Sequence, residues 1–272
     1  MSATTEAPGA WPRDKVPRKL KRELRWVAVL GTSLLAAMAL VLSVLEGPAA
    51  ALPWLLAGLV GWGFVLWQCH KRLYLNRRSL DDTGYATLGH GNRITLLRGL
   101  LIAATAGFLA IAHIELQAWL LYVPAALYTA AALGDGLDGY MARRQQQTTR
   151  LGMELDTGLD AFGLVIAPLL AVLYGKLQVS YLLVSIAYYL FQWGIYWRQS
   201  HGNPVHPLPP SSLRRYLAGL QMALVALALW PPLPAELTRN LGFALMIPLL
   251  VGFCRDWLHV SGRLGAGRES SL

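Results

Sequence analysis

Eight apolar stretches separated by short polar connections dominate the pattern of this chain. Each is close to the ~20 residues that an α-helix needs to cross the hydrocarbon core of a bilayer. The stretches are residues 26–45, 50–69, 94–113, 117–134, 153–174, 178–197, 214–231 and 238–255. This pattern predicts an all-α fold, a polytopic membrane helix bundle of about eight spans.

The basic residues are distributed unevenly over the connections. If the stretches cross the membrane in turn, 22 of the 24 lysines and arginines fall on one side, and only Lys176 and Arg239 fall on the other. Cytoplasmic loops of membrane proteins carry the excess of positive charge. We therefore expect an integral protein of the inner or cytoplasmic membrane with both termini in the cytoplasm.

Composition supports the same class of protein. Hydrophobic residues make up 55% of the chain and charged residues only 14%, as in polytopic membrane proteins. The formal charge of +9 does not indicate nucleic-acid binding, because the basic residues are scattered between apolar spans. Topology and contact with anionic lipid explain them better.

Two groups of aspartates interrupt the apolar pattern at neighbouring ends of the fourth and fifth stretches. Residues i, i+3, i+4 and i+7 share one face of an α-helix. The first group places Asp135, Asp138, Gly139 and Ala142 in these positions, and the second places Gly152, Asp156 and Asp160 at intervals of four. If the two helices face each other, four carboxylates converge beside small residues that allow a ligand close to the backbone.

Carboxylates at such a place indicate bound cations. A charged side chain within a membrane span costs at least about 2.5–3.5 kcal/mol and normally faces a cavity, a partner or an ion. Hard divalent ions choose oxygen ligands, and two ions roughly 3.5–4 Å apart are a recurrent device for displacement at phosphorus. The alternative is that the aspartates cap helices or lie on a solvated loop. The glycines on the same faces favour the metal site.

The order and spacing of these residues resemble the signature of the CDP-alcohol phosphatidyltransferase family (CDP-alcohol phosphotransferases), D-x2-D-G-x2-A-R-x8-G-x3-D-x3-D. Every spacing is kept by Asp135, Asp138, Gly139, Ala142, Arg143, Gly152, Asp156 and Asp160. The resemblance implies a transferase of the EC 2.7.8 type, which moves a substituted phosphate from a CDP-linked donor to an alcohol and releases CMP in phospholipid biosynthesis.

The resemblance also implies a six-helix core, which the last six spans would form. We expect a basic cytosolic N-terminal tail (1–25), two additional transmembrane helices with a connecting loop (26–90), the catalytic core (91–256) and a cytosolic C-terminal tail (257–272). The active site would then lie at the cytoplasmic side. A homodimer is a further implication of the family.

Roles for the site residues follow from the resemblance. Asp135, Asp138 and Asp156 would ligate Mg²⁺ or Mn²⁺, with two ions expected. Asp160 would ligate or border the second ion and accept the proton of the attacking hydroxyl. Around the nucleotide, Gly139, Ala142 and Gly152 would permit close approach, and Arg143 would pair with a carboxylate or a phosphate oxygen.

A polar element precedes the third span. Asn92, Thr95 and Arg98 recur every three residues. Asn and Thr can cap a helix, whereas a helix N-terminus with a nearby arginine can also bind an anion. Many family members have a similar N-x2-T-x2-R element led by proline, where this chain has Gly91. Beside the aspartate motif, we expect these three residues to line the nucleotide pocket.

The donor, the acceptor and three rival functions are open at this point. CDP-diacylglycerol is the favoured donor because the protein is so deeply embedded, but a soluble CDP-alcohol with a lipid acceptor fits the family as well. Glycerol 3-phosphate, inositol phosphate and serine are possible acceptors. The rivals are an intramembrane Mg²⁺-dependent prenyltransferase, a transporter with an acidic ion site, and a non-catalytic scaffold. The sequence argues against each of them. The two acidic clusters lie within 26 residues, closer than in the prenyltransferases; there is no internal repeat, which transporters commonly carry; and Asp160 is intact, which argues against a scaffold.

Overall fold

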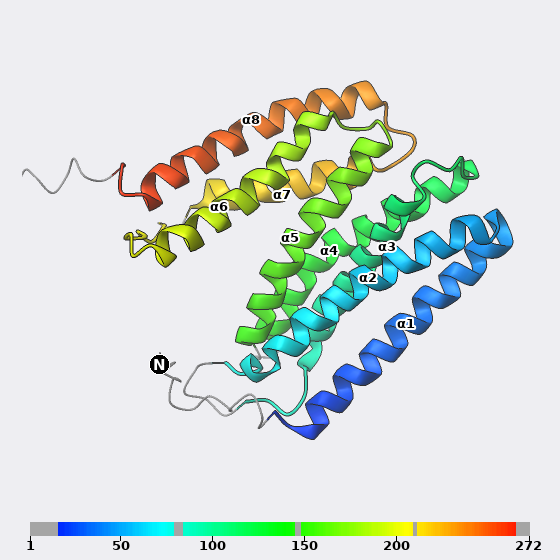
Figure 1. Cartoon of the computed structure of the whole chain (residues 1–272), viewed down its shortest axis with the longest axis horizontal. Coiled ribbons are helices and arrows are strands. Elements are labelled where there is room, and N and C mark those ends of the chain that lie inside the picture. Colours follow the sequence, from blue (N-terminus) through cyan, green and yellow to red (C-terminus); the bar gives the residue numbers. More distant parts are fainter. Residues whose placement is uncertain (1–15, 79–83, 145–147, 209–210, 265–272) are drawn as a thin grey trace, which may run out of the picture. The chain divides into compact units, whose positions relative to one another are not determined.

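The computed structural model describes residues 16–78, 84–144, 148–208 and 211–264, without the side chains of residues 138–140, 142 and 143. This part of the chain is helical and contains no strand, so the all-α prediction is confirmed (Figure 1). The helices are α1 (Arg18–Glu46), α2 (Pro48–Arg72), α3 (Gly89–Ala110), α4 (Tyr122–Arg144), α5 (Arg150–Leu173), α6 (Leu183–Ser200), α7 (Ser212–Ala228) and α8 (Ala235–Val260). Short 3-10 turns precede α4 and α6 and follow α2.

Seven of these helices are long and apolar enough to cross a membrane. They support the predicted integral membrane protein. The remaining helix, α7, is the shortest of the eight, with 17 residues, at the lower limit of the roughly 17–25 that a span uses. The sequence predicts about eight membrane spans. The described residues contain seven candidate spans and one shorter helix.

The chain forms two compact units, residues 1–170 and 171–272. In the first unit, α1 packs on α2, α2 on α3, and α3 on α4 (Figure 1). A single residue, Gly47, separates α1 from α2 and has a φ of 84°, in the region that glycine adopts without steric cost. A cluster of Ile102, Ala106, Ala131 and Ile166 joins α3 and α4 to the part of α5 in this unit.

Small residues let α2 and α3 approach closely. A Cβ on Gly99 would lie 2.6 Å from Cγ1 of Val65, and one on Gly107 would lie 2.6 Å from Nε1 of Trp54. Interfaces between membrane helices are rich in such residues, because association depends on van der Waals packing. Helix α3 is the most enclosed span, with 67% of its most apolar window buried.

Two helices, α1 and α3, begin at least five residues earlier than the pattern of apolar stretches predicts. α1 begins at Arg18 and takes in most of the basic segment expected in a cytosolic tail, and α3 begins at Gly89, five residues before the expected 94. Asn92 and Thr95 therefore lie within α3. Its N-cap residue is Leu88, which makes no side-chain capping bond, so the alternative in which Asn92 or Thr95 is the N-cap is wrong.

In the second unit, α6, α7 and α8 are joined by polar side chains as well as by apolar packing. The hydroxyl of Tyr181 donates to Oε1 of Gln221, whose Nε2 donates to the carbonyl of Leu245 at 2.7 Å. The loop that follows α7 is fixed by Lys176, whose Nζ donates to the carbonyls of residues 230, 231 and 233 at 2.6–3.3 Å.

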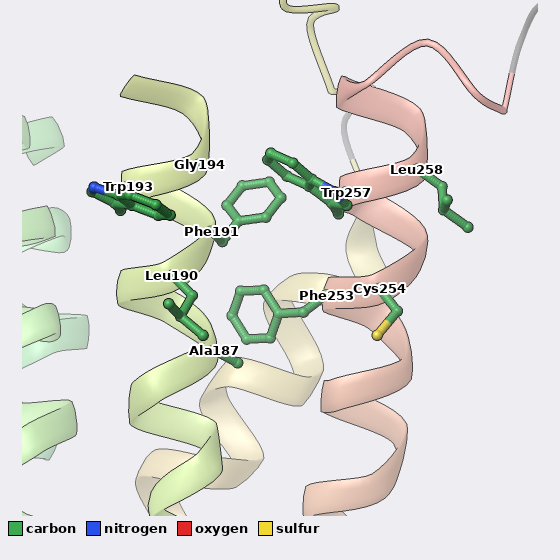
Figure 2. Close-up of a pocket in the computed structure, with 9 residues that line it drawn as sticks. All are labelled: Ala187, Leu190, Phe191, Trp193, Gly194, Phe253, Cys254, Trp257 and Leu258. Carbon is green, nitrogen blue, oxygen red and sulfur yellow. The ribbon is translucent and has the colours of Figure 1, made fainter. Parts of the chain in front are cut away.

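An apolar groove of about 540 Å³ lies between α6 and α8 (Figure 2). Figure 2 shows Phe191 of α6 and Phe253 of α8 pointing into it, with Trp257 beside them. The ring of Trp257 packs directly on the backbone of α6, since a Cβ on Gly194 would lie 2.6 Å from its Cζ3. The described residues that line this groove are mainly apolar and aromatic.

Candidate active site

Three carboxylates converge in the first unit. Asp135 comes from α4, whereas Asp156 and Asp160 come from α5, one helical turn apart. One oxygen of each lies within 4.8 Å of the others. The spacing of four residues places Asp156 and Asp160 on one face of α5, and that face meets α4 at Asp135. The sequence predicts this convergence for four aspartates; the side chain of the fourth, Asp138, lies outside the description.

A single arginine from α3 joins the three carboxylates. Nη1 of Arg98 donates to Oδ1 of Asp156 at 2.6 Å. Its Nη2 lies 2.7 Å from Oδ1 of Asp135 and 2.8 Å from Oδ1 of Asp160. The arginine side chain is 3% exposed and the carboxylates are 37–43% exposed. Charge-assisted bonds of this kind are about twice as strong as neutral ones, so Arg98 ties three helices together at the site.

Two features of α4 hold the arginine in place. Nε of Arg98 donates to the carbonyl of Ala131 at 3.2 Å, and the aliphatic stem of the same side chain runs against Gly134. A Cβ at Gly134 would lie only 2.8 Å from Cγ of Arg98. Gly134 therefore makes room for the Arg98 side chain, a role that the sequence pattern does not indicate, although Gly134 directly precedes the first aspartate.

Asn92 lies in a buried hydrogen-bond network next to the start of α5. Its Nδ2 donates to the carbonyl of Leu88 at 2.8 Å, to Oδ1 of Asn76 at 3.1 Å and to Oγ1 of Thr149 at 3.2 Å. Thr149 in turn accepts from the backbone N–H of Gly152 at 3.0 Å. The threonine hydroxyl thus satisfies one of the N–H groups that a helix leaves unpaired in its first turn.

Gly152 is needed for this packing. A Cβ there would lie 2.6 Å from Oδ1 of Asn92. In the structure the glycine therefore makes room for the side chain of Asn92. The third member of the polar element, Thr95, is buried and donates to the carbonyl of Gly91 at 3.1 Å. Contacts of Asn92, Thr95 and Gly152 with a nucleotide stay predictions.

The structure describes only the backbone of four predicted site residues. Asp138, Gly139, Ala142 and Arg143 lie in the helical backbone of α4, but their side chains fall outside the description. Their predicted roles as a metal ligand and as nucleotide contacts therefore stay predictions.

Sequence reasoning missed the residues ahead of α3 that contact this network. Asn76 is buried, and its Nδ2 donates to the carbonyls of Tyr85 and Thr87 at 2.9 and 2.8 Å. Glu23 of α1 accepts from the backbone N–H of Leu88 at 3.0 Å. Neither residue belongs to a periodic pattern or a motif, so only the folded chain reveals them.

The donor chemistry of the cluster fits a divalent cation. All three side chains offer carboxylate oxygens, the ligands that Mg²⁺ and Mn²⁺ prefer, and each carboxylate has a second oxygen besides the one that faces Arg98. The oxygens are close enough to share an ion. Among the described side chains of the cluster, one guanidinium faces three carboxylates, so further cations suit its electrostatics.

The fold and the site together define an integral membrane protein with an acidic centre between its helices. The particular family is shown by comparison: the chain belongs to the CDP-alcohol phosphatidyltransferase family, whose model matches residues 89–254. This family implies transferase activity and confirms the resemblance seen in the sequence. The match begins at the first residue of α3, so α1 and α2 precede it. No curated protein and no solved structure matches the chain significantly.

Proposed function

We propose that the protein transfers a phosphatidyl group from CDP-diacylglycerol to an alcohol, with release of CMP, in phospholipid biosynthesis. The observation that carries this proposal is the convergence of Asp135, Asp156 and Asp160 on Arg98, inside the segment that matches the family. The same match favours phosphatidyl transfer over prenyl transfer, transport or a scaffold.

In the reaction, the oxygen of the acceptor alcohol forms a bond to the β-phosphorus of the donor. The bond between that phosphorus and the oxygen of CMP breaks, and the hydroxyl proton passes to a carboxylate of Asp160. Positioning and charge neutralisation supply most of the rate in such displacements. Two helices, α4 and α5, carry the carboxylates, and Arg98 of α3 links them, which keeps them fixed relative to one another.

Asp135, Asp138, Asp156 and Asp160 would hold one or two divalent cations, Mg²⁺ or Mn²⁺. When bound, these ions would neutralise charge on the pyrophosphate and on the leaving CMP oxygen. Arg98 keeps the carboxylate oxygens of α4 and α5 directed toward one point, and it would also offer its guanidinium to a phosphate oxygen.

The location of the site supports a lipid substrate. Asp135 lies in the second half of α4, and Asp156 and Asp160 lie in the first half of α5, the halves nearer the face that the positive-inside rule assigns to the cytoplasm. There a cytosolic acceptor and a membrane-held diacylglycerol moiety can both reach the carboxylates. The homodimer remains only an implication of the family.

The test is CMP release by the full-length protein in detergent, with CDP-diacylglycerol, Mg²⁺ or Mn²⁺ and a panel of alcohols. Asp160→Asn should abolish metal-dependent release. Glu154→Gln is the matched control, because Glu154 lies on the same helix, is 55% exposed and pairs with Arg72 at 3.5 Å instead of with Arg98. If folded wild-type protein released no CMP with either lipid or soluble CDP-linked donors, the proposal would be overturned.

A further inference from the structure

The start of α3 depends on a residue from another helix. Its N-cap, Leu88, has no side-chain cap, and its first turn contains no acidic residue. The missing acceptor is supplied by Glu23 of α1, 65 residues earlier, whose Oε2 accepts from the N–H of Leu88 at 3.0 Å. A carboxylate at a helix N-terminus is favourable both as a hydrogen-bond acceptor and through the helix dipole.

Arg93 also contacts this carboxylate, through an exposed ion pair. Its Nε and Nη2 lie 2.7 and 2.6 Å from Oε1 of Glu23. Glu23 is 16% exposed, whereas Arg93 is 50% exposed. Ion pairs with an exposed partner contribute little to stability, so the bond to the helix start is the more important of the two contacts.

A second contact reaches the same turn of α3 from the connection that follows α2. Asn76 is 2% exposed. It accepts from Asn92 while both hydrogens of its own amide are used by carbonyls of the connection. Through Asn92 and Thr149 this contact continues to the N–H of Gly152, one turn before Asp156 on α5.

We propose that two residues ahead of α3, Glu23 of α1 and Asn76 of the described part of the connection after α2, form a positioning element for the candidate site. This inference rests on the proposed function and adds to it a part of the chain that precedes the family match. Glu23 sets where α3 begins, and Asn76 sets how the starts of α3 and α5 meet. Together they fix the side from which Arg98 reaches the carboxylates, two turns further along α3.

The principal variant is Glu23→Gln, which keeps the shape of the side chain but removes its charge and directs an amide N–H at other donors. The matched control is Glu46→Gln. Glu46 lies at the opposite end of α1 and also accepts a backbone N–H, that of Gln117 at 3.0 Å, but it lies outside the network around α3. Arg93→Gln separates the ion pair from the helix cap, and Asn76→Ala tests the second contact independently.

Two readouts are taken on the full-length protein in lipid nanodiscs. Amide hydrogen exchange is followed over residues 88–93, and CMP release gives kcat and KM for CDP-diacylglycerol. We expect Glu23→Gln and Asn76→Ala to raise exchange at these amides at least tenfold and to raise KM at least threefold. Glu46→Gln and Arg93→Gln should stay within twofold of wild type in both readouts.

The inference would be overturned if amide exchange over residues 88–93 were unchanged in both Glu23→Gln and Asn76→Ala. It would also be overturned if Glu46→Gln raised this exchange as much as they do. Increased exchange in these two variants with wild-type kcat and KM would also overturn the inference, because the element would then stabilise α3 without positioning the site. Absence of CMP release by wild-type protein would instead overturn the proposed function. The exchange data would still decide whether Glu23 and Asn76 hold the start of α3.

Discussion

Nη2 of Arg98 lies 2.8 Å from Oδ1 of Asp160, although the two residues are 62 positions apart in the chain. The same nitrogen lies 2.7 Å from Asp135 on a third helix. One buried cation therefore fixes the relative positions of α3, α4 and α5 at the point where the family motif places its carboxylates. The arginine belongs to the site as much as the aspartates do.

The geometry of Arg98 leads to the first prediction. Lysine has a single ammonium group and cannot offer the fork that reaches Asp156 with one nitrogen and Asp160 with another. Arg98→Lys should reduce kcat/KM for CMP release at least tenfold. Because the carboxylates are partly exposed, the free energy of unfolding should fall by about 2 kcal/mol, less than for a fully buried pair. Activity assays and thermal unfolding in detergent measure both, and wild-type kcat/KM in this variant would contradict the assigned role.

Two glycines of α4 provide an internally controlled pair for the second prediction. A Cβ at Gly134 would meet the stem of Arg98 at 2.8 Å, whereas one at Gly136 meets nothing within 4 Å. Gly→Ala within a helix normally stabilises by about 1 kcal/mol, so Gly136→Ala should raise the unfolding midpoint slightly. In Gly134→Ala the pinned arginine has to shift, and we expect a net loss of about 1–2 kcal/mol together with lower activity. Equal behaviour of the two variants would show that Arg98 is not held against α4.

Helical spacing explains how much of the site could be predicted from the sequence. Asp156 and Asp160 are four residues apart, so their common face follows from the geometry of any α-helix. The apolar stretches likewise predict the helical bundle, because a bilayer permits few other structures. These predictions use local periodicity, which the sequence displays directly.

Contacts made by irregular segments could not be predicted in this way. Asn76 lies in a connection without periodicity, and Glu23 lies among basic residues that resemble a surface anchor. Their partners are fixed only when α1 and α2 pack on α3. For the same reason the apolar pattern predicts a span from residue 94, whereas α3 begins at Gly89, where the N–H of Leu88 donates to Glu23, 65 residues earlier.

The acidic cluster leads to a third prediction, on metal binding. A ligand that binds only the folded state raises stability with its concentration, so Mn²⁺ should raise the unfolding midpoint of the wild-type protein in detergent. Asp135→Asn and Asp156→Asn each remove a charged ligand and should increase the Mn²⁺ concentration for half-maximal effect at least tenfold. Glu154→Gln should respond like the wild type, and EDTA should reverse the shift. If the aspartate variants kept the wild-type response, the ions would be bound elsewhere.

The distribution of basic residues leads to a fourth prediction, on topology. Gln199 lies at the end of α6, and Gln117 lies in the connection between α3 and α4. The topology predicted from the basic residues places Gln199 in the cytoplasm and Gln117 on the other side of the membrane. The native thiols, Cys69 and Cys254, are first replaced by serine. In intact cells, a membrane-impermeant maleimide should then label Gln117→Cys but not Gln199→Cys, and permeabilisation should expose both. Labelling of Gln199→Cys in intact cells would place the basic connections outside the cytoplasm. The predicted topology places the carboxylates in the half of the membrane nearer the basic connections, so a cytosolic acceptor could then not reach the site as proposed.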